Sequence, residues 1–179
     1  MSNISAAQVK ELREKTGLGL MDCKKALEDA EGNMDKAIEE LRKTSGVKAS
    51  KKSGRSAADG LIAIKNIEDQ IFMIEVNCET DFVARDDSFI EFTSQTLKSY
   101  SENSDKTLQE LMDDGIEDNR EKIVQKLGEN IVVRRVAKTE SSTITGSYLH
   151  SNNKIGCIVS LEGGSHDLSL IHISEPTRR

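Results

Sequence analysis

The segment from Asn77 to Arg85 carries a carboxylate, Asp81, beside two apolar residues, Phe82 and Val83, at a place where a polar loop is expected. A carboxylate can hold a cation or act as a general base, whereas an exposed aromatic ring can bind an apolar pocket of another molecule. Two interpretations of Phe82 are open at this point. Its ring either folds back into the core or is displayed by a loop between rigid elements, where binding residues concentrate.

The rest of the sequence offers no group of residues arranged for catalysis. It contains no phosphate-binding loop, zinc-protease helix or nucleophile elbow. His150, His166 and His172 all lie near the C-terminal end, and none is spaced to pair with a Cys or an Asp. The acidic pairs Asp86–Asp87 and Asp113–Asp114 are explained by the favourable interaction of negative charge with helix N-termini. We therefore expect no enzyme activity, no metal site and no cofactor.

Composition narrows the classes of partner. The net charge is −6, the pI is near 5.2 and aromatic residues make up only 3 %, which argues against direct nucleic-acid binding. No apolar run approaches the roughly 20 residues that span a bilayer, and the N-terminal residues do not resemble a secretory signal. Cys23, Cys78 and Cys157 are odd in number and include no CxxC pair. Reduced thiols in a cytoplasmic protein are therefore expected.

Residues 1–45 predict three short helices. Ser5 and Gln8 form a capping box at the start of the first helix, and Asn33 is a favourable N-cap for the third. Each helix is apolar on one side, so the three can bury those sides only against one another. The connection after the first helix displays Leu20 and Met21, which are either core residues or contacts for a partner; both interpretations stay open.

The following residues predict a linker and then a mixed core. Residues 46–56 are basic and rich in Ser and Gly, which indicates a linker, partly helical in one interpretation, whose charges either face solvent or contact a partner. Apolar runs at 61–64 and 71–76 predict a β-hairpin. Capping boxes at Ser88–Glu91 and Thr107–Glu110 predict helices, and further strands follow between residues 131 and 161. Because strands and helices are clustered rather than alternating, we expect an α+β fold.

Two segments carry a resemblance to a known family. TGLGLMDCKKAL at 16–27 and EVNCETDFVAR at 75–85 resemble the two signatures of the elongation factor Ts family. Shorter matches occur in the same order and spacing, namely at Ala57–Gly60, Gly128–Ile131, Arg134–Arg135, Gly146–Tyr148 and His150.

The resemblance implies a domain organisation. Residues 1–45 correspond to a ubiquitin-associated-like three-helix domain, 46–56 to the basic linker and 57–140 to the first subdomain of the core. Residues 141–168 correspond to the start of a second core subdomain, which in the family continues further, so a C-terminally truncated chain is expected. Residues 169–179 resemble a translated sequencing adapter, and we expect them to form a foreign or disordered tail.

The resemblance also implies a function. In this family a non-enzymatic factor binds elongation factor Tu and promotes release of GDP. The matching residues Thr80, Asp81, Phe82 and Val83 are expected to enter the GTPase domain, where Phe82 fills an apolar pocket and Asp81 disturbs the magnesium ion that holds the nucleotide. Leu20, Met21 and His150 are further candidates for partner binding.

Two other classes of function remain as alternatives. An adaptor that binds a ubiquitin-like protein explains residues 1–45 but gives residues 80–83 no role. A small metal-dependent enzyme using the acidic pairs explains neither of the two signatures.

Overall fold

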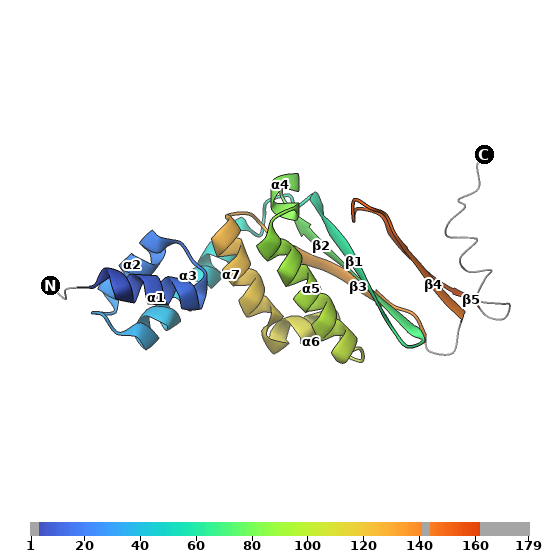
Figure 1. Ribbon diagram of the computed structural model, residues 1–179, viewed down its shortest axis with the longest axis horizontal. Helices are drawn as coiled ribbons and strands as arrows, with labels where there is room; N and C mark the ends of the chain where they lie inside the picture. Colours follow the sequence, from blue (N-terminus) through green and yellow to red (C-terminus); the bar gives the residue numbers. More distant parts are fainter. Residues whose placement is uncertain (1–3, 141–143, 162–179) are drawn as a thin grey trace. The chain divides into compact units, whose positions relative to one another are not determined.

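A computed structural model of the chain describes residues 4–140 and 144–161 (Figure 1). These residues form two compact units, one made of residues 4–55 with 117–130 and the other of residues 56–116 with 131–140 and 144–161. Helices and antiparallel strands are clustered along the chain, which confirms the α+β fold class. The predicted tail at 169–179 lies outside the described residues, as do His166 and His172.

The first unit is helical and begins with the predicted three-helix module. Its helices are α1 (Ala6–Thr16), α2 (Leu20–Asp29), α3 (Met34–Lys52) and α7 (Glu117–Leu127). The Ser5–Gln8 capping box and the Asn33 N-cap are both confirmed. Gly17 ends α1 at φ +69°, a conformation that glycine adopts without strain. The buried apolar residues of the module are Val9, Leu12, Leu18, Cys23, Ala26, Leu27, Ala37 and Leu41.

The third helix extends through residues 46–52, so the expected linker is partly helical, in line with one of its two interpretations. The physical reason is packing against α7, which arrives from much later in the chain. Arg42 forms an ion pair with Asp118, and the buried Ser45 hydroxyl bonds to Gln125 on α7. The two helices approach so closely that a Cβ on Gly46 would lie 3.1 Å from the Glu121 carboxylate.

The second unit is built on a three-stranded antiparallel sheet. Its strands are β1 (Asp59–Ile67), β2 (Gln70–Cys78) and β3 (Val132–Lys138), in the order β1-β2-β3. The predicted hairpin is confirmed, with Ile64 opposite Met73 in the β1–β2 register. Glu68 adopts φ +49° in the connecting turn.

One face of this sheet is covered by α5 (Asp87–Glu102), as Figure 1 shows. Phe72 of β2 meets Tyr100 of α5 edge to face, with ring centroids 5.7 Å apart. The predicted Ser88–Glu91 capping box is wrong, because the Asp86 carboxylate caps α5 by accepting a 2.8 Å bond from the Ser88 amide. The shorter elements near α5 are α4 (Asp81–Ala84), α6 (Leu108–Leu111), which starts at the predicted Thr107–Glu110 capping box, and the π-helical turn η1 (Met112–Ile116).

The opposite face of the sheet meets a second hairpin, formed by β4 (Ile144–Leu149) and β5 (Gly156–Leu161) (Figure 1). Gly156 lies so close to β1 that a Cβ there would be 2.7 Å from the Ile62 side chain. Within these two strands Gly146 alone is buried, so the hairpin covers the sheet only in part. Among the described residues, no helix is both long and apolar enough to span a membrane.

Candidate protein-binding turn

Residues 80–83 form one turn of helix rather than the open loop that the sequence suggests. The Thr80 side chain accepts a 3.4 Å hydrogen bond from the Val83 amide and so caps α4. At the end of β2, the Cys78 thiol donates a 3.2 Å bond to the Thr80 carbonyl. Ala84 is buried and anchors the other end of the turn. We call residues 80–83 the TDFV turn.

The ring of Phe82 projects from this turn into solvent. It is 82 % exposed, the largest exposed fraction among the large apolar side chains in the described residues. The interpretation of Phe82 as a core residue is therefore wrong. Burying a phenylalanine side chain is worth about 1.5–3 kcal/mol, which the isolated fold does not gain at this position.

The neighbouring carboxylate is held by a local ion pair. Asp81 accepts a 2.9 Å bond from the Arg85 guanidinium, one helical turn away. The side chains of the two residues are 42 % and 77 % exposed, respectively. Because exposed pairs of this kind contribute only about 0–1 kcal/mol, Asp81 can exchange Arg85 for another cation at little cost.

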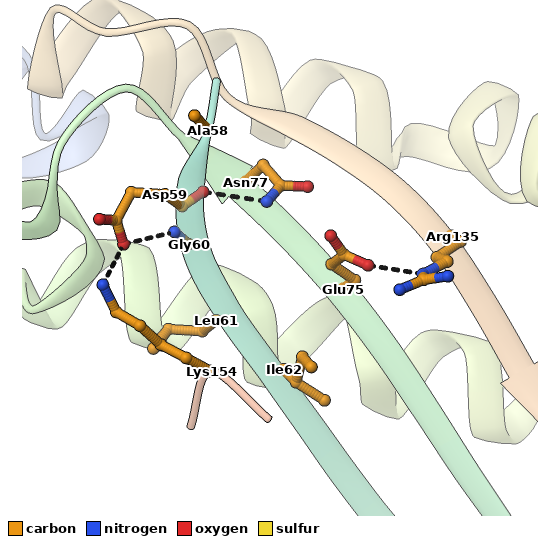
Figure 2. Close-up of a pocket in the computed structure, with 9 residues that line it drawn as sticks. All are labelled: Ala58, Asp59, Gly60, Leu61, Ile62, Glu75, Asn77, Arg135 and Lys154. Carbon is orange, nitrogen blue, oxygen red and sulfur yellow. Dashed lines mark hydrogen bonds and ion pairs between the residues drawn. The ribbon is translucent and has the colours of Figure 1, made fainter. Parts of the chain in front are cut away.

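A polar cavity of about 210 Å³, drawn in Figure 2, lies where β1 begins and β2 ends, just before the TDFV turn in the sequence. The backbones approach closely there: Gly60 has φ +146°, and a Cβ would lie 2.2 Å from the Val76 carbonyl oxygen. The Asn77 side-chain amide donates a 3.0 Å bond to the Asp59 carbonyl. Its own Oδ1 is buried and accepts no hydrogen bond from the described residues.

The Asp59 carboxylate of this cavity has two hydrogen-bond partners. It lies 2.6 Å from the Lys154 ammonium and accepts a 2.8 Å bond from the Gly60 amide (Figure 2). These two hydrogen bonds lower the pKa of Asp59 below its ordinary value, and the positive charges of Lys154 and Arg85 add to the effect against the opposing desolvation. Asp59 is therefore ionised at neutral pH. It interacts electrostatically with Arg85, which follows the TDFV turn, and with Lys154 of the β4–β5 connection.

Leu20 and Met21 belong to the other compact unit, where they start α2. They are 50 % and 73 % exposed, whereas the core position of this connection is taken by Leu18. The interpretation of Leu20 and Met21 as core residues is wrong. Asp22, the next residue, pairs with Lys48 of α3 at 3.1 Å, which fixes the start of the helix.

His150 lies in the connection between β4 and β5. Its Nδ1 is 2.7 Å from the Tyr148 hydroxyl, and its backbone amide donates a 2.9 Å bond to the Ile155 carbonyl. Tyr148 and Ile155 are themselves 39 % and 60 % exposed, so the hairpin end displays apolar groups that are not among the predicted contact residues. The alternating pattern of β4 was a usable signal, but it does not say which face of a strand is solvent-exposed.

The acidic pairs have local structural roles. Asp86 caps α5, Asp113 accepts a 3.1 Å bond from Gln109, and Asp114 pairs with Lys106. Within residues 4–140 and 144–161, no group of three or more His, Cys, Asp or Glu side chains could hold a metal ion. Cys23 and Cys78 are buried thiols, while Cys157 is exposed.

Comparison with known proteins gives a consistent set of relatives. Residues 79–174 match the family model described as Elongation factor TS. The chain is 53 % identical over 171 residues to elongation factor Ts of Marinobacter nauticus and 50 % identical to that of Hahella chejuensis, with 94 % of this chain and 59 % of each relative covered. It is 47 % identical to elongation factor Ts of Arthrospira platensis, covering 71 % of that protein. The chain thus spans about three-fifths of the length of the first two relatives.

Proposed function

The chain belongs to the elongation factor Ts family, and we propose that it promotes guanine-nucleotide exchange on elongation factor Tu during translation elongation in the cytoplasm. The observation that carries the proposal is the TDFV turn, which displays Phe82 at 82 % exposure on a capped and anchored helical turn. An apolar side chain held this way is suited to enter a pocket of another protein.

The TDFV turn supplies two different interactions in this proposal. Phe82 fills an apolar pocket in the GTPase domain of elongation factor Tu, and the turn needs no refolding because Thr80 already caps it. Asp81 leaves its exposed pair with Arg85 and disturbs the ligands of the magnesium ion beside the bound nucleotide. Because that ion offsets the phosphate charge, its loss weakens GDP binding.

Release of the chain from elongation factor Tu follows from the coupling between nucleotide binding and binding of the chain. If the chain weakens nucleotide binding by some factor, nucleotide must weaken binding of the chain by the same factor. Reloading of elongation factor Tu therefore expels the chain. No covalent bond is made or broken, so the proposal describes an exchange factor and not an enzyme.

The N-terminal unit supplies a second contact in the proposal. Leu20 and Met21 are neighbouring apolar side chains, both exposed, on the first turn of α2. We assign them to docking on the GTPase domain. Replacing both with Ala tests this assignment better than deleting residues 1–45, because α7 packs against α3 through Arg42 and Ser45, which the deletion would remove.

His150 is the third proposed contact. It is exposed at the end of the β4–β5 hairpin together with Tyr148 and Ile155, and the Tyr148 hydroxyl fixes its ring. The hairpin end therefore presents a mixed aromatic and polar surface suited to a protein partner.

Two observations favour this function over its alternatives. A ubiquitin-binding adaptor gives the exposed Phe82 no role, although it is the most exposed large apolar side chain described. A metal-dependent enzyme needs a ligand cluster, and the described residues contain none.

The deciding experiment follows the release of fluorescent GDP from elongation factor Tu by stopped-flow fluorescence. We expect the chain to accelerate release in a saturable way, with Phe82→Ala impaired and Val47→Ala unaffected. Val47 is the matched control because it is an exposed apolar residue, at 56 %, on a helix outside the proposed contacts. A release rate that does not depend on the concentration of the chain would contradict the proposal.

A further inference from the structure

The β4–β5 hairpin is attached to the sheet at few points. It forms its own two-stranded sheet, and two-stranded hairpins are marginally stable by themselves. A backbone hydrogen bond of 2.7 Å runs from the Ile62 amide to the Asn153 carbonyl in the turn, and Gly156 packs closely on Ile62. Within β4, Ser147 Oγ donates a 3.4 Å bond to Asn66 Oδ1. These contacts hold the hairpin near β1 but leave its orientation weakly determined.

The Asp59–Lys154 pair adds a charged contact between β1 and the β4–β5 connection. Lys154 is in the same β4–β5 connection as His150, and its ammonium lies 2.6 Å from Asp59 (Figure 2). Asp59 pairs with Cys78 in the β1–β2 register, and Cys78 in turn bonds to the Thr80 carbonyl. The ion pair therefore links the hairpin end to the strand ends that hold the TDFV turn.

The charges along this path alternate in sign. Asp81 pairs with Arg85 at 2.9 Å, the positive charge of Arg85 also acts on Asp59, and Asp59 pairs with Lys154. Arg85 thus lies in the field of both carboxylates. When Asp81 leaves Arg85 to contact a partner, Arg85 still attracts Asp59. The Asp59–Lys154 pair therefore persists when the Asp81–Arg85 pair is broken.

We propose that Asp59 and Lys154 are positioning residues, which orient the β4–β5 hairpin so that His150 and the TDFV turn meet one partner surface together. The inference rests on the proposed function. Neither residue needs to touch the partner, because their role is to hold two contact elements in one arrangement before binding. Preorganisation of this kind lowers the ordering cost of association without adding a contact.

The partial exposure of the two side chains distinguishes a positioning role from simple stabilisation of the fold. The Asp59 and Lys154 side chains are 26 % and 44 % exposed, so their pair contributes little to global stability. Loss of the pair should therefore weaken binding while the folded state persists. It should leave the chemistry at the magnesium ion unchanged, because Asp81 and Phe82 are untouched.

The test uses the full chain and compares Lys154→Met, Lys154→Arg and the control Lys98→Met. Lys98 is matched because it forms an exposed ion pair with Glu102 within α5 of the same unit. The first measurement is amide hydrogen exchange at Ile62, whose bond to Asn153 reports on the attachment of the hairpin. We expect faster exchange in Lys154→Met, near-wild-type exchange in Lys154→Arg and no change in Lys98→Met.

The second measurement is a titration of GDP release from elongation factor Tu. For Lys154→Met we expect the half-maximal concentration to rise about fivefold, equivalent to about 1 kcal/mol, with an unchanged maximal rate. Lys154→Arg should restore the wild-type value. On a His150→Ala background the effect of Lys154→Met should largely vanish, because a misplaced hairpin matters only if its end binds.

The outcomes distinguish the positioning role from the function on which it rests. Unchanged Ile62 exchange, an unchanged half-maximal concentration or full additivity with His150→Ala overturns the positioning role while exchange activity stands. A wild-type chain that releases no GDP overturns the proposed function, and the hydrogen-exchange comparison still decides whether the ion pair fixes the hairpin.

Discussion

Phe89 and Phe82 are close in the sequence and have opposite surroundings. Phe89, in the first turn of α5, is 0 % exposed against the sheet, whereas Phe82 is 82 % exposed on the TDFV turn. The same side chain therefore supports the fold at one position and is left unburied at the other. The TDFV turn is therefore held by its own cap, Thr80, and by the neighbouring Cys78 and Ala84, while its exposed ring adds little to the stability of the fold.

The largest expected difference is in stability. Phe89→Ala should lower the free energy of unfolding by about 3–5 kcal/mol, because it removes buried contacts and leaves a cavity. Phe82→Ala should change it by less than about 0.5 kcal/mol. Urea unfolding followed by circular dichroism measures both. Comparable losses in the two variants would show that Phe82 is a core residue in solution.

The next effect is on binding. Phe82→Ala should weaken the nucleotide-free complex with elongation factor Tu by roughly ten- to a hundredfold, since the exposed ring becomes buried only in the proposed complex. Isothermal titration calorimetry measures the change, with Val47→Ala as the control. Wild-type affinity in Phe82→Ala would remove the TDFV turn from the interface.

A third prediction separates the two residues at the tip of the turn. Asp81→Ala should slow GDP release roughly tenfold when magnesium is present, because in the proposed mechanism the carboxylate acts on the ligands of the ion. A chelator that removes magnesium should shrink the Asp81 defect but leave most of the Phe82 defect, which comes from packing. Release rates for both variants with and without chelator provide the measurement. A chelator-independent Asp81 defect would contradict the magnesium argument.

The smallest effect concerns Asp59 in the polar cavity and depends on pH. The pKa of Asp59 is lowered in the folded chain, so its ion pair stabilises the fold above the unfolded pKa of about 3.9 and ceases to do so as the pH falls through the lower folded value. Asp59→Asn should therefore be less stable than wild type at neutral pH, by at most about 1 kcal/mol. The difference in unfolding free energy between the two proteins should disappear in acid. Urea unfolding at a series of pH values tests this, and a gap that widens in acid would contradict it.

Features set by neighbouring residues in the chain were predictable from the sequence. The caps at Ser5, Asn33 and Thr107 were identified correctly because a capping side chain reaches only two or three residues along the chain. The β1–β2 hairpin followed from its two apolar runs. At α5 the same reasoning chose Ser88, although Asp86 offers an equally local and competing cap.

Features set by distant contacts were not predictable in the same way. A partly helical linker was one interpretation of residues 46–56, but the packing of α3 against α7 is not revealed by any local pattern. The exposure of Phe82 depends on which side of a four-residue helix faces the core, and so short a segment has no usable period. The ion pair of Asp59 with Lys154 joins residues far apart in the sequence, so only the folded chain brings them together.

The return of α7 to the N-terminal unit has a consequence for synthesis. A ribosome makes α3 long before α7. Arg42 and Ser45 on α3 therefore lack their partners Asp118 and Gln125 until α7 has been synthesised. At roughly 5–20 residues per second this interval lasts several seconds. The nascent helix therefore emerges with one flank uncovered, and the N-terminal unit reaches its final form only after much of the sheet unit has been translated.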